Sequence, residues 1–225
     1  MKNAIYLYPF YLFLLMLGFS CSQKEDKQAE SAPESTEVQE KSERKTILFF
    51  GNSLTAGYGI EDYEAFPALI QEKLDSMETD YQVINGGLSG ETTASGLSRL
   101  DWFLEEKPAI FILELGGNDG LRGISLEETE KNLRGIINSV QEEYPDTKIL
   151  LAGMQIPPNM GQAYTDNFRK MYAEIAEDEE VALIPFLLEG VAGDPEYNLP
   201  DGIHPTAAGH QIVAQTVWQY LKPLL

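Results

Sequence analysis

Short runs of consecutive apolar residues alternate along the chain with longer segments in which apolar residues recur at helical spacing. Consecutive apolar residues are typical of strands covered on both faces, and the wider spacing is typical of helices with one buried face. The runs predict strands at Ile47–Phe50, Tyr81–Asn85, Ala109–Leu115, Lys148–Met154 and Val181–Pro185. The spaced segments predict helices at Asp62–Met77, Thr92–Leu104, Leu126–Tyr144, Ala163–Glu177 and Thr206–Leu221.

Individual residues support the ends of these predicted helices. Pro67 fits the first turn of its helix, where the missing N–H does no harm. Ser125 can cap the helix that follows it, and either Thr92 or Thr93 can cap an earlier one. The segment Phe186–Asp201 has no regular spacing and is expected to be irregular.

Strand and helix alternate without an internal repeat or a second domain. This alternation predicts an α/β fold, a doubly wound (flavodoxin-like) parallel five-stranded sheet with helices on both faces. In open sheets of this kind, ligands bind beyond the carboxyl ends of the strands. The loops that follow the strands are therefore the first place to look for chemistry.

The amino-terminal segment has a different character. Lys2 gives it a positive start, and Ala4–Phe19 is almost wholly apolar. This run is short for a membrane span and has the length of a signal-peptide core, so Met1–Ser20 is expected to be a cleaved signal segment. Ser20 directly precedes Cys21, the single cysteine of the chain, as in a bacterial lipoprotein cleavage site.

A lone cysteine cannot form an internal disulfide. We expect Cys21 to be lipidated at the start of the mature protein and to anchor it to a bacterial membrane, on the periplasmic side or at the cell surface. Gly18 departs from the lipoprotein pattern, which prefers Leu three residues before the cysteine. The alternative is a plain secreted protein with an incidental free thiol.

Ser22–Lys45 is rich in Glu, Ser, Gln and Lys and poor in apolar residues. Such a segment cannot bury enough surface to fold, so residues 21–45 are expected to be a lipidated, disordered tether. Of the 36 acidic and 16 basic residues in the chain, 29 and 10 fall in the domain 46–225, which leaves it a net charge of about −19. That charge argues against binding nucleic acid or an anionic lipid surface through bulk electrostatics, and it also favours solubility.

The first predicted strand ends in the sequence GNSL, residues 51–54. Gly51 permits a sharp turn and Asn52 tolerates turn conformations. Ser53 is therefore expected at the carboxyl end of the strand, where ligands bind. On these residues alone, a strand followed by an ordinary polar loop is the simpler interpretation.

The segment DGIHP, residues 201–205, precedes the last predicted helix. Its Asp201 could orient the His204 imidazole, and imidazole is the natural base for a serine hydroxyl near neutral pH. Alone, the segment equally fits an Asx turn that caps the helix. His210, the only other histidine, lies inside a predicted helix as a surface or packing residue, so His204 is the base available to Ser53.

Acyl transfer also needs hydrogen-bond donors for the developing oxyanion. Gly90 lies just before a helix N-terminus, where backbone N–H groups lack partners, and Asn118 offers a side-chain amide. Separately, Gly90 could be a loop hinge and Asn118 a turn residue. The fold would bring GNSL, GLSGET, GGND and DGIHP to one rim, an arrangement that chance does not readily explain.

These blocks resemble the SGNH (GDSL-type) hydrolases, a family named for catalytic Ser, Gly, Asn and His residues. They stand here as GNSLTAGYG, GLSGET, ELGGNDGLRG and DGIHP, and the resemblance covers residues 46–225. It is nearest to the bacterial thioesterase/lysophospholipase/arylesterase subgroup. The resemblance implies that Ser53 is the nucleophile, His204 the base and Asp201 the acid that orients the base.

The same resemblance implies an oxyanion hole formed by the Ser53 N–H, the Gly90 N–H and the Asn118 side chain. One departure is Asn52, where the family has Asp. Because that Asp is not a triad member, the change is expected to alter loop hydrogen bonds more than chemistry. The region Gln155–Tyr164 would lie near the acyl-binding groove.

We therefore expect a serine esterase that hydrolyses carboxylic esters or thioesters (arylesterase-, lysophospholipase- or thioesterase-like) through an acyl-enzyme on Ser53. We expect no metal, because two separated histidines and one terminal cysteine make no zinc site, and no cofactor, because no phosphate-cradling motif is present. One alternative is a carbohydrate O-acetyl esterase with the same chemistry. Another is a non-catalytic surface lipoprotein that binds a partner through its acidic face.

Overall fold

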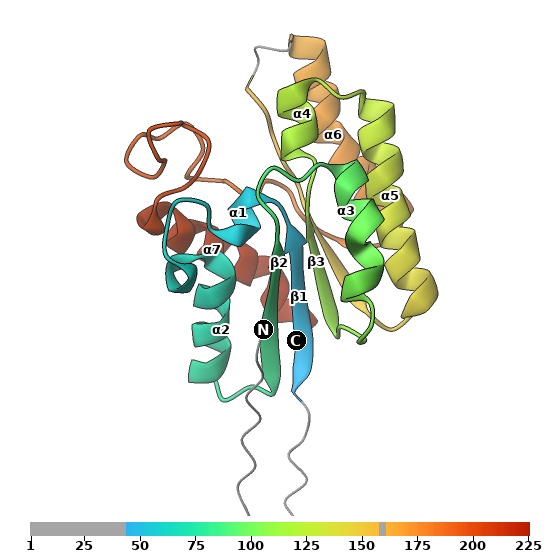
Figure 1. Ribbon diagram of the computed structural model, residues 1–225, viewed down its shortest axis with the longest axis vertical. Helices are drawn as coiled ribbons and strands as arrows, with labels where there is room; N and C mark the ends of the chain where they lie inside the picture. Colours follow the sequence, from blue (N-terminus) through green and yellow to red (C-terminus); the bar gives the residue numbers. More distant parts are fainter. Residues whose placement is uncertain (1–43, 158–160) are drawn as a thin grey trace, which may run out of the picture. The chain divides into compact units, whose positions relative to one another are not determined.

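A parallel five-stranded sheet forms the centre of the computed structural model, which describes residues 44–157 and 161–225 (Figure 1). The strands are β1 (Lys45–Gly51), β2 (Tyr81–Gly87), β3 (Ile110–Glu114), β4 (Lys148–Ala152) and β5 (Ala182–Ile184). They lie in the order β2-β1-β3-β4-β5, and every neighbouring pair is parallel. This order confirms the expected doubly wound, flavodoxin-like arrangement.

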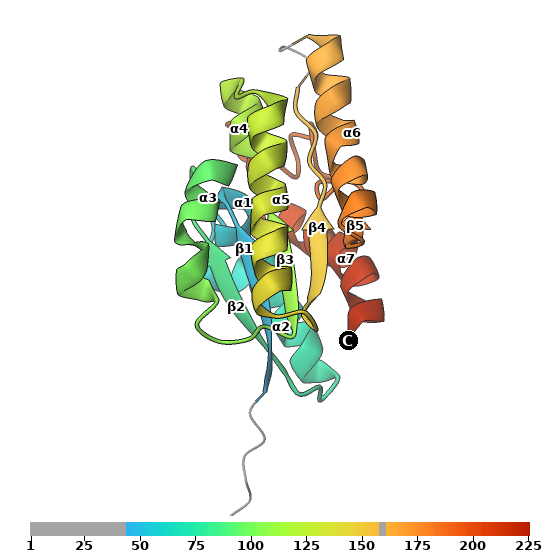
Figure 2. The same ribbon diagram turned by 90° about the vertical axis from the view of Figure 1, so that its right-hand side faces the viewer.

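Helices cover both faces of the sheet, as predicted (Figures 1 and 2). They are α1 (Ser53–Ala56), α2 (Phe66–Ser76), α3 (Thr93–Arg99), α4 (Gly117–Arg122), α5 (Leu126–Glu143), α6 (Gln162–Asp178) and α7 (Ala207–Leu221). The helices α2 and α7 pack together on one face, and α3, α5 and α6 form the layer on the other. The short helices α1 and α4 follow β1 and β3 at the carboxyl edge of the sheet.

Consecutive phenylalanines in β1 join the sheet to both helical layers, because neighbouring strand residues point to opposite faces. Phe49 meets Phe66 of α2 edge to face, with ring centroids 5.5 Å apart. Phe50 meets Phe103, which follows α3, at 5.4 Å. Every residue of β3 is buried, as expected for a strand covered on both faces.

The edge strand β2 departs from the prediction that both faces of each strand are covered, since Ile84 and Asn85 are exposed. Gln71 of α2 pairs with the backbone of this strand. Its Oε1 accepts a hydrogen bond from the Val83 N–H at 2.6 Å, and its Nε2 donates to the Tyr81 carbonyl oxygen at 3.4 Å. The Gln71 amide thereby occupies backbone groups that another strand could otherwise pair with.

The GGND block, residues 116–119, was predicted to be a loop, but Gly117–Arg122 forms the helix α4. Gly116 at its N-cap has a φ of 105°, and Gly123 at its C-cap has a φ of 67°. These left-handed conformations let the chain enter and leave a helix of six residues abruptly. Gly116, one of the glycines that suggested a loop, is therefore the N-cap of a short helix, which ends at Gly123.

The predicted helix Asp62–Met77 is also interrupted. A 3₁₀ turn at Asp62–Glu64 precedes α2, and Ala65 between them is extended. A continuous helix would place Pro67 in its interior, where the ring clashes with the carbonyl group four residues earlier. Pro67 instead lies in the first turn of α2, as predicted, and Ser125 caps α5, as predicted.

The first strand starts at Lys45, one residue before the predicted domain boundary. The predicted signal segment Met1–Ser20, Cys21 and the predicted tether up to residue 43 lie outside the described residues. Within residues 44–157 and 161–225, no helix has the length and apolar character needed to cross a membrane.

His210 of α7 is a packing residue, with only 1% of its surface exposed. Its Nδ1 accepts a hydrogen bond from the Phe66 backbone N–H at 3.1 Å, and the two rings stack with centroids 5.9 Å apart. Burial lowers the pKa of His210 to about 4, and the charge of His204 acts in the same direction. His210 therefore stays neutral in the folded protein over the pH range in which a free imidazole becomes charged.

Acid should destabilise the fold through His210. Between pH 6.5 and about 4 the unfolded chain binds a proton here that the folded chain does not, so the free energy of unfolding falls by up to about 3 kcal/mol. We expect His210→Asn, whose side-chain oxygen can still accept the Phe66 N–H, to lack this component. Urea denaturation of both proteins at pH 7 and pH 4.5 measures the difference, and an equal decline in both would contradict the assignment.

Candidate active site

Ser53 is the first residue of α1, directly beyond the end of β1. Asn52 caps this helix, because its side-chain oxygen accepts the Leu54 N–H at 2.9 Å. The Ser53 residue is nearly buried, with 8% of its surface exposed. The first N–H groups of a helix have no partner within it, so the Ser53 N–H can donate a hydrogen bond to a ligand at the carboxyl edge of the sheet.

His204 and Asp201 lie beside Ser53 and form a hydrogen-bonded line with it. His204 Nε2 is 2.9 Å from the Ser53 hydroxyl oxygen, and His204 Nδ1 is 2.7 Å from Asp201 Oδ2. Ser53 comes from the end of β1, and the other two residues come from the loop before α7. The predicted convergence of these segments is therefore present, with distances suited to proton transfer.

The Asp201 carboxylate also organises its own loop. Its Oδ1 accepts the backbone N–H groups of Ile203 and His204 at 2.9 and 3.0 Å, so the Asx turn considered from the sequence exists together with the triad geometry. The backbone hydrogen bond from His204, then its ring, then the Ile203 N–H lower the pKa of Asp201 to about 2. Asp201 is therefore charged at neutral pH and can stabilise a protonated imidazole.

Tyr58 is a site residue that the sequence reasoning missed. Its ring lies against the His204 ring, with centroids 4.5 Å apart, and its N–H donates to the Ser53 carbonyl oxygen at 3.0 Å. Gly57 and Gly59 on either side have positive φ angles of 76° and 81°. The sequence GYG was the available signal, since two such glycines let the chain turn Tyr58 back over the site.

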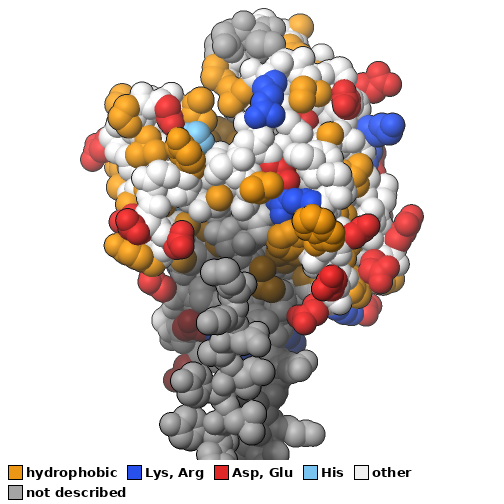
Figure 3. All heavy atoms as spheres, in the orientation of Figure 1, with side chains coloured by type: hydrophobic (Ala, Val, Ile, Leu, Met, Phe, Trp, Pro, Cys, Tyr) orange, Lys and Arg blue, Asp and Glu red, His pale blue; other side chains and the backbone are white. Residues whose placement is uncertain are grey.

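Ser53, Asn118 and His204 line one cavity of about 180 Å³. Most of its remaining wall is apolar, with side chains of Leu54, Leu121, Met154, Ile156, Pro157, Leu188 and Ile203. Hydrophobic side chains also border a histidine on the face drawn in Figure 3. The predicted groove region Gln155–Tyr164 contributes residues 155–157 to the wall, and residues 158–160 lie outside the described chain.

The two other predicted oxyanion residues are linked through Glu91. Asn118 in α4 donates from its side-chain nitrogen to the Glu91 carbonyl oxygen at 3.0 Å. An amide nitrogen carries two hydrogens, so the second can be donated to a substrate in the cavity. Gly90, the residue before Glu91, has a φ of 82° and lies in the exposed loop between β2 and α3. Its carbonyl oxygen accepts a hydrogen bond from Arg122 Nη2 at 3.0 Å.

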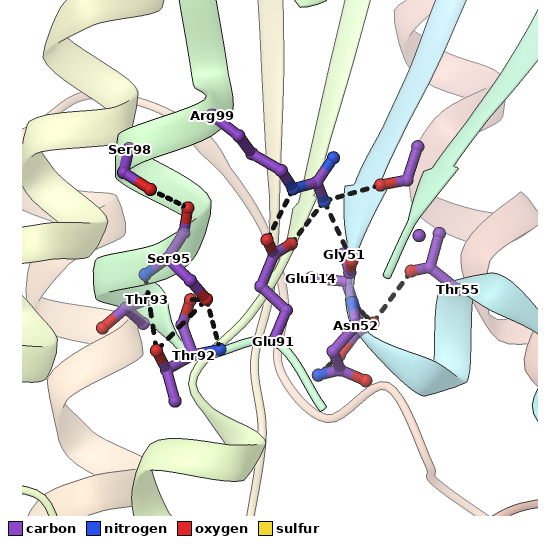
Figure 4. A network of polar contacts seen from close by, with 12 residues as sticks. Gly51, Asn52, Thr55, Glu91, Thr92, Thr93, Ser95, Ser98, Arg99 and Glu114 are labelled. Atoms are coloured by element: carbon purple, nitrogen blue, oxygen red, sulfur yellow. Dashed lines mark hydrogen bonds and ion pairs between the residues drawn. The ribbon is translucent and has the colours of Figure 1, made fainter. Parts of the chain in front are cut away.

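Glu114, at the end of β3, is a second residue that the sequence reasoning missed. It lies fully buried beneath the nucleophile turn (Figure 4) and accepts the Asn52 N–H at 3.0 Å, the Asn52 side-chain amide at 2.7 Å and the Thr55 hydroxyl at 2.8 Å. Burial raises the pKa of Glu114 to about 7, although these hydrogen bonds oppose the shift. The sequence led us to expect that Asn52 would alter the hydrogen bonds of its loop, and the structure shows its side-chain amide bonded to a buried carboxyl group.

Within the part of the chain that the structure describes, no group of three or more His, Cys, Asp or Glu side chains could hold a metal ion. The groups placed for chemistry are instead the hydroxyl of Ser53, the ring of His204 and the neighbouring N–H donors. This arrangement can activate a serine hydroxyl as a nucleophile.

Comparison with known proteins gives a consistent result. A family model described as the GDSL-like lipase/acylhydrolase family matches residues 49–212. The chain is 42% identical over 182 residues to esterase TesA of Pseudomonas aeruginosa, which covers 80% of this chain and 90% of that protein. It is 36% identical over 181 residues to thioesterase 1/protease 1/lysophospholipase L1 of Escherichia coli, which covers 80% of this chain and 85% of that protein. A crystal structure of TesA matches the fold with a TM-score of 0.77 at 42% identity, over 80% of this chain and 100% of that one.

The bond between Asn52 and Glu114 leads to a test of pH dependence. Asn52→Asp would place a second carboxyl group about where the amide now lies 2.7 Å from Glu114 Oε1. Two carboxyl groups that close share a proton and resist ionising together. We expect the variant to lose at least about tenfold in kcat/KM, relative to the unchanged protein, between pH 6 and pH 9, because repulsion distorts the nucleophile turn.

Asn138→Asp is the control for this variant, since it adds the same charge on the exposed face of α5. Its activity ratio to the unchanged protein should not vary with pH. A ratio for Asn52→Asp that also stays constant from pH 6 to pH 9 would show that the buried pair does not form.

Proposed function

Because the chain belongs to the GDSL-like lipase/acylhydrolase family, the SGNH hydrolases, we propose that it hydrolyses its substrates through an acyl-enzyme on Ser53. It is an esterase of the class that acts on carboxylic esters or thioesters. The observation that carries the assignment of roles is the unbroken hydrogen-bonded line from Asp201 through His204 to Ser53.

In the first half of the reaction, His204 Nε2 takes the Ser53 proton while the serine oxygen attacks the carbonyl carbon. The charged Asp201 stabilises the imidazolium that results. His204 then gives the proton to the leaving oxygen or sulfur atom, and the bond from the carbonyl carbon to that atom breaks. Water attacks the acyl-enzyme by the same route, which releases the acid and restores Ser53.

We assign three hydrogen-bond donors to the negative oxygen that develops on the carbonyl group. They are the Ser53 N–H, the Gly90 N–H and the Asn118 side chain. Asn118 supports this assignment because it lines the same cavity as Ser53 and because Glu91 fixes its amide. Each donor in such a hole typically contributes ~100- to 1,000-fold in rate. The donors therefore supply a large part of the catalysis.

The cavity supports a preference for small apolar groups. Its wall is mainly apolar, and its volume of about 180 Å³ is close to that of a ~150 Å³ protein cavity that holds benzene. We expect short acyl chains or single aromatic rings to fit better than long chains.

Ser53→Ala and His204→Ala should each lower kcat/KM for p-nitrophenyl acetate and butyrate by at least about 1,000-fold, because nucleophile and base act as a unit. Asn118→Ala should lower kcat by ~100- to 1,000-fold. Ser76→Ala, an exposed serine of α2, is the matched control and should leave the rate unchanged. Near-normal hydrolysis by Ser53→Ala or His204→Ala would refute the assignment.

A serine-reactive fluorophosphonate separates this enzyme from a non-catalytic binding protein. Mass spectrometry should find the label on Ser53 of the unchanged protein and find none on Ser53 of the His204→Ala variant at short times. A panel of acetylated sugars assayed beside the p-nitrophenyl esters tests the carbohydrate esterase alternative, which requires the sugars to be hydrolysed faster.

We further propose that the esterase is a lipoprotein held to a bacterial membrane through Cys21. The support is the sequence alone: an apolar leader, a small residue before a single cysteine and a polar tether after it. Two acyl chains on one residue suffice for stable attachment to a bilayer.

The anchor predicts a change of compartment in Cys21→Ser. In a bacterial host the unchanged protein should fractionate with membranes and carry lipid on an N-terminal Cys21, as judged by mass spectrometry of the mature chain. The variant should fractionate with the soluble proteins and keep its esterase activity. A lipid-free mature protein that begins at another residue would overturn this proposal.

A further inference from the structure

A buried ion pair joins Arg99 of α3 to Glu91, the residue that follows Gly90 in the chain (Figure 4). The Glu91 side chain is fully buried, and 13% of the Arg99 side chain is exposed. Arg99 Nε donates to Glu91 Oε1 at 2.5 Å, and Arg99 Nη2 also bonds Glu91 Oε2. Both carboxylate oxygens are therefore held by one planar guanidinium group.

The same guanidinium group reaches the ends of two strands. Arg99 Nη2 donates to the Gly86 carbonyl oxygen of β2 at 2.7 Å and lies 3.5 Å from the Gly51 carbonyl oxygen of β1. Its central carbon also lies 4.2 Å from the centre of the Phe50 ring and 4.8 Å from that of Phe103. Arg99 thus ties the Glu91 loop to the strand end that carries the nucleophile.

The backbone of Glu91 contacts the residues proposed as oxyanion donors. Its carbonyl oxygen accepts the Asn118 side chain at 3.0 Å, and its backbone continues directly from Gly90. Contacts therefore run from Arg99 to the Glu91 carboxylate, and from the Glu91 backbone to Asn118 and Gly90. None of these contacts places Arg99 itself against the substrate.

We infer that Arg99 is a positioning residue for ester hydrolysis, which fixes the Gly90 N–H and the Asn118 amide through Glu91. This inference rests on the proposed function. The geometry requires arginine, because five donors in a rigid plane serve the carboxylate and a carbonyl group at once, whereas a lysine ammonium cannot reproduce that fork. Without the guanidinium, the buried Glu91 charge would lack its partner, and the loop would move to expose it.

The loss of Arg99 should act on the transition state more than on substrate binding. Arg99→Met should lower kcat for p-nitrophenyl butyrate by at least about 100-fold, comparable to the loss of one oxyanion donor. KM should change by less than about threefold, because the walls of the cavity are untouched. Arg99→Lys should recover only part of kcat.

A thionoester of the same acid and alcohol provides a readout that general damage to the fold does not change. Its sulfur accepts hydrogen bonds more weakly than oxygen, so its hydrolysis depends less on the oxyanion donors. The ratio of ester to thionoester rate should fall in Arg99→Met toward the value for Asn118→Ala. Arg134→Met is the matched control, because Arg134 also forms several ion pairs, one with Glu130 within α5 and two with Asp178 and Glu179 at the end of α6. It should keep the normal ratio and kcat within about twofold, since neither Arg134 nor any of its ion-pair partners lines the cavity.

The outcomes are distinguishable. A ratio of ester to thionoester rate in Arg99→Met that equals that of the unchanged protein would overturn the inference, even if both rates fall. If Arg99→Met does not fold, Arg99→Lys decides, and a normal ratio in folded Arg99→Lys has the same consequence. Ser53→Ala is assayed in parallel: if it stays active the proposed function fails, and if it is inactive while the Arg99 variants are normal, only the role of Arg99 fails.

Discussion

The hydrogen bond between His204 and Ser53 joins residues that are 151 positions apart, and no local structure holds them together. Ser53 is placed by β1, which pairs with strands on both sides. His204 is placed by a loop that folds back on itself: the Leu199 N–H donates to the His204 carbonyl oxygen at 2.7 Å, and the Thr206 N–H donates to the Tyr197 carbonyl oxygen at 2.8 Å. Thr206 then caps α7, which packs on α2. The catalytic contact therefore depends on how the first strand and the last helix are packed into one fold.

Two carboxyl groups near Ser53 show how surroundings divide the work in a strongly acidic domain. Asp201 is partly exposed and receives three N–H donors, which keep it charged and able to support an imidazolium. Glu114 is fully buried, and desolvation moves its pKa toward neutrality while its oxygens hold the turn that carries the nucleophile. Glu91, a third carboxyl group near the site, is buried like Glu114 but has a guanidinium partner instead. Burial, exposure and pairing thus give three carboxyl groups three different tasks.

The sequence predicted a feature correctly where the residues that indicate it and the element that they form lie in the same short segment. The apolar runs marked the strands, and the position of Ser53 after such a run placed it at the correct edge. It failed where partners are distant: the acceptor role of Glu114 depends on Asn52, 62 positions earlier, and Glu114 itself looks like an ordinary polar residue at a strand end. Arg99 was equally invisible, because its partners are the Glu91 side chain and carbonyl groups at the ends of two strands. Local glycine content was also misleading at α4, where left-handed glycines bound a helix rather than a loop.

The direction of β1 has a geometric consequence for a domain held by its amino terminus. The chain joins the sheet at Lys45, and the ester is attacked at the other end of the same strand, beyond Gly51. Seven residues of strand at ~3.3 Å each separate the two points by about 23 Å. If Cys21 anchors the domain as proposed, tension along the tether would pull on the Lys45 end of the strand and leave the Gly51 end, which Ser53 follows, pointing away from the anchor. Substrates that arrive from solution would then reach Ser53 directly, whereas lipids of the anchoring membrane would reach it only when the tether lets the domain turn over.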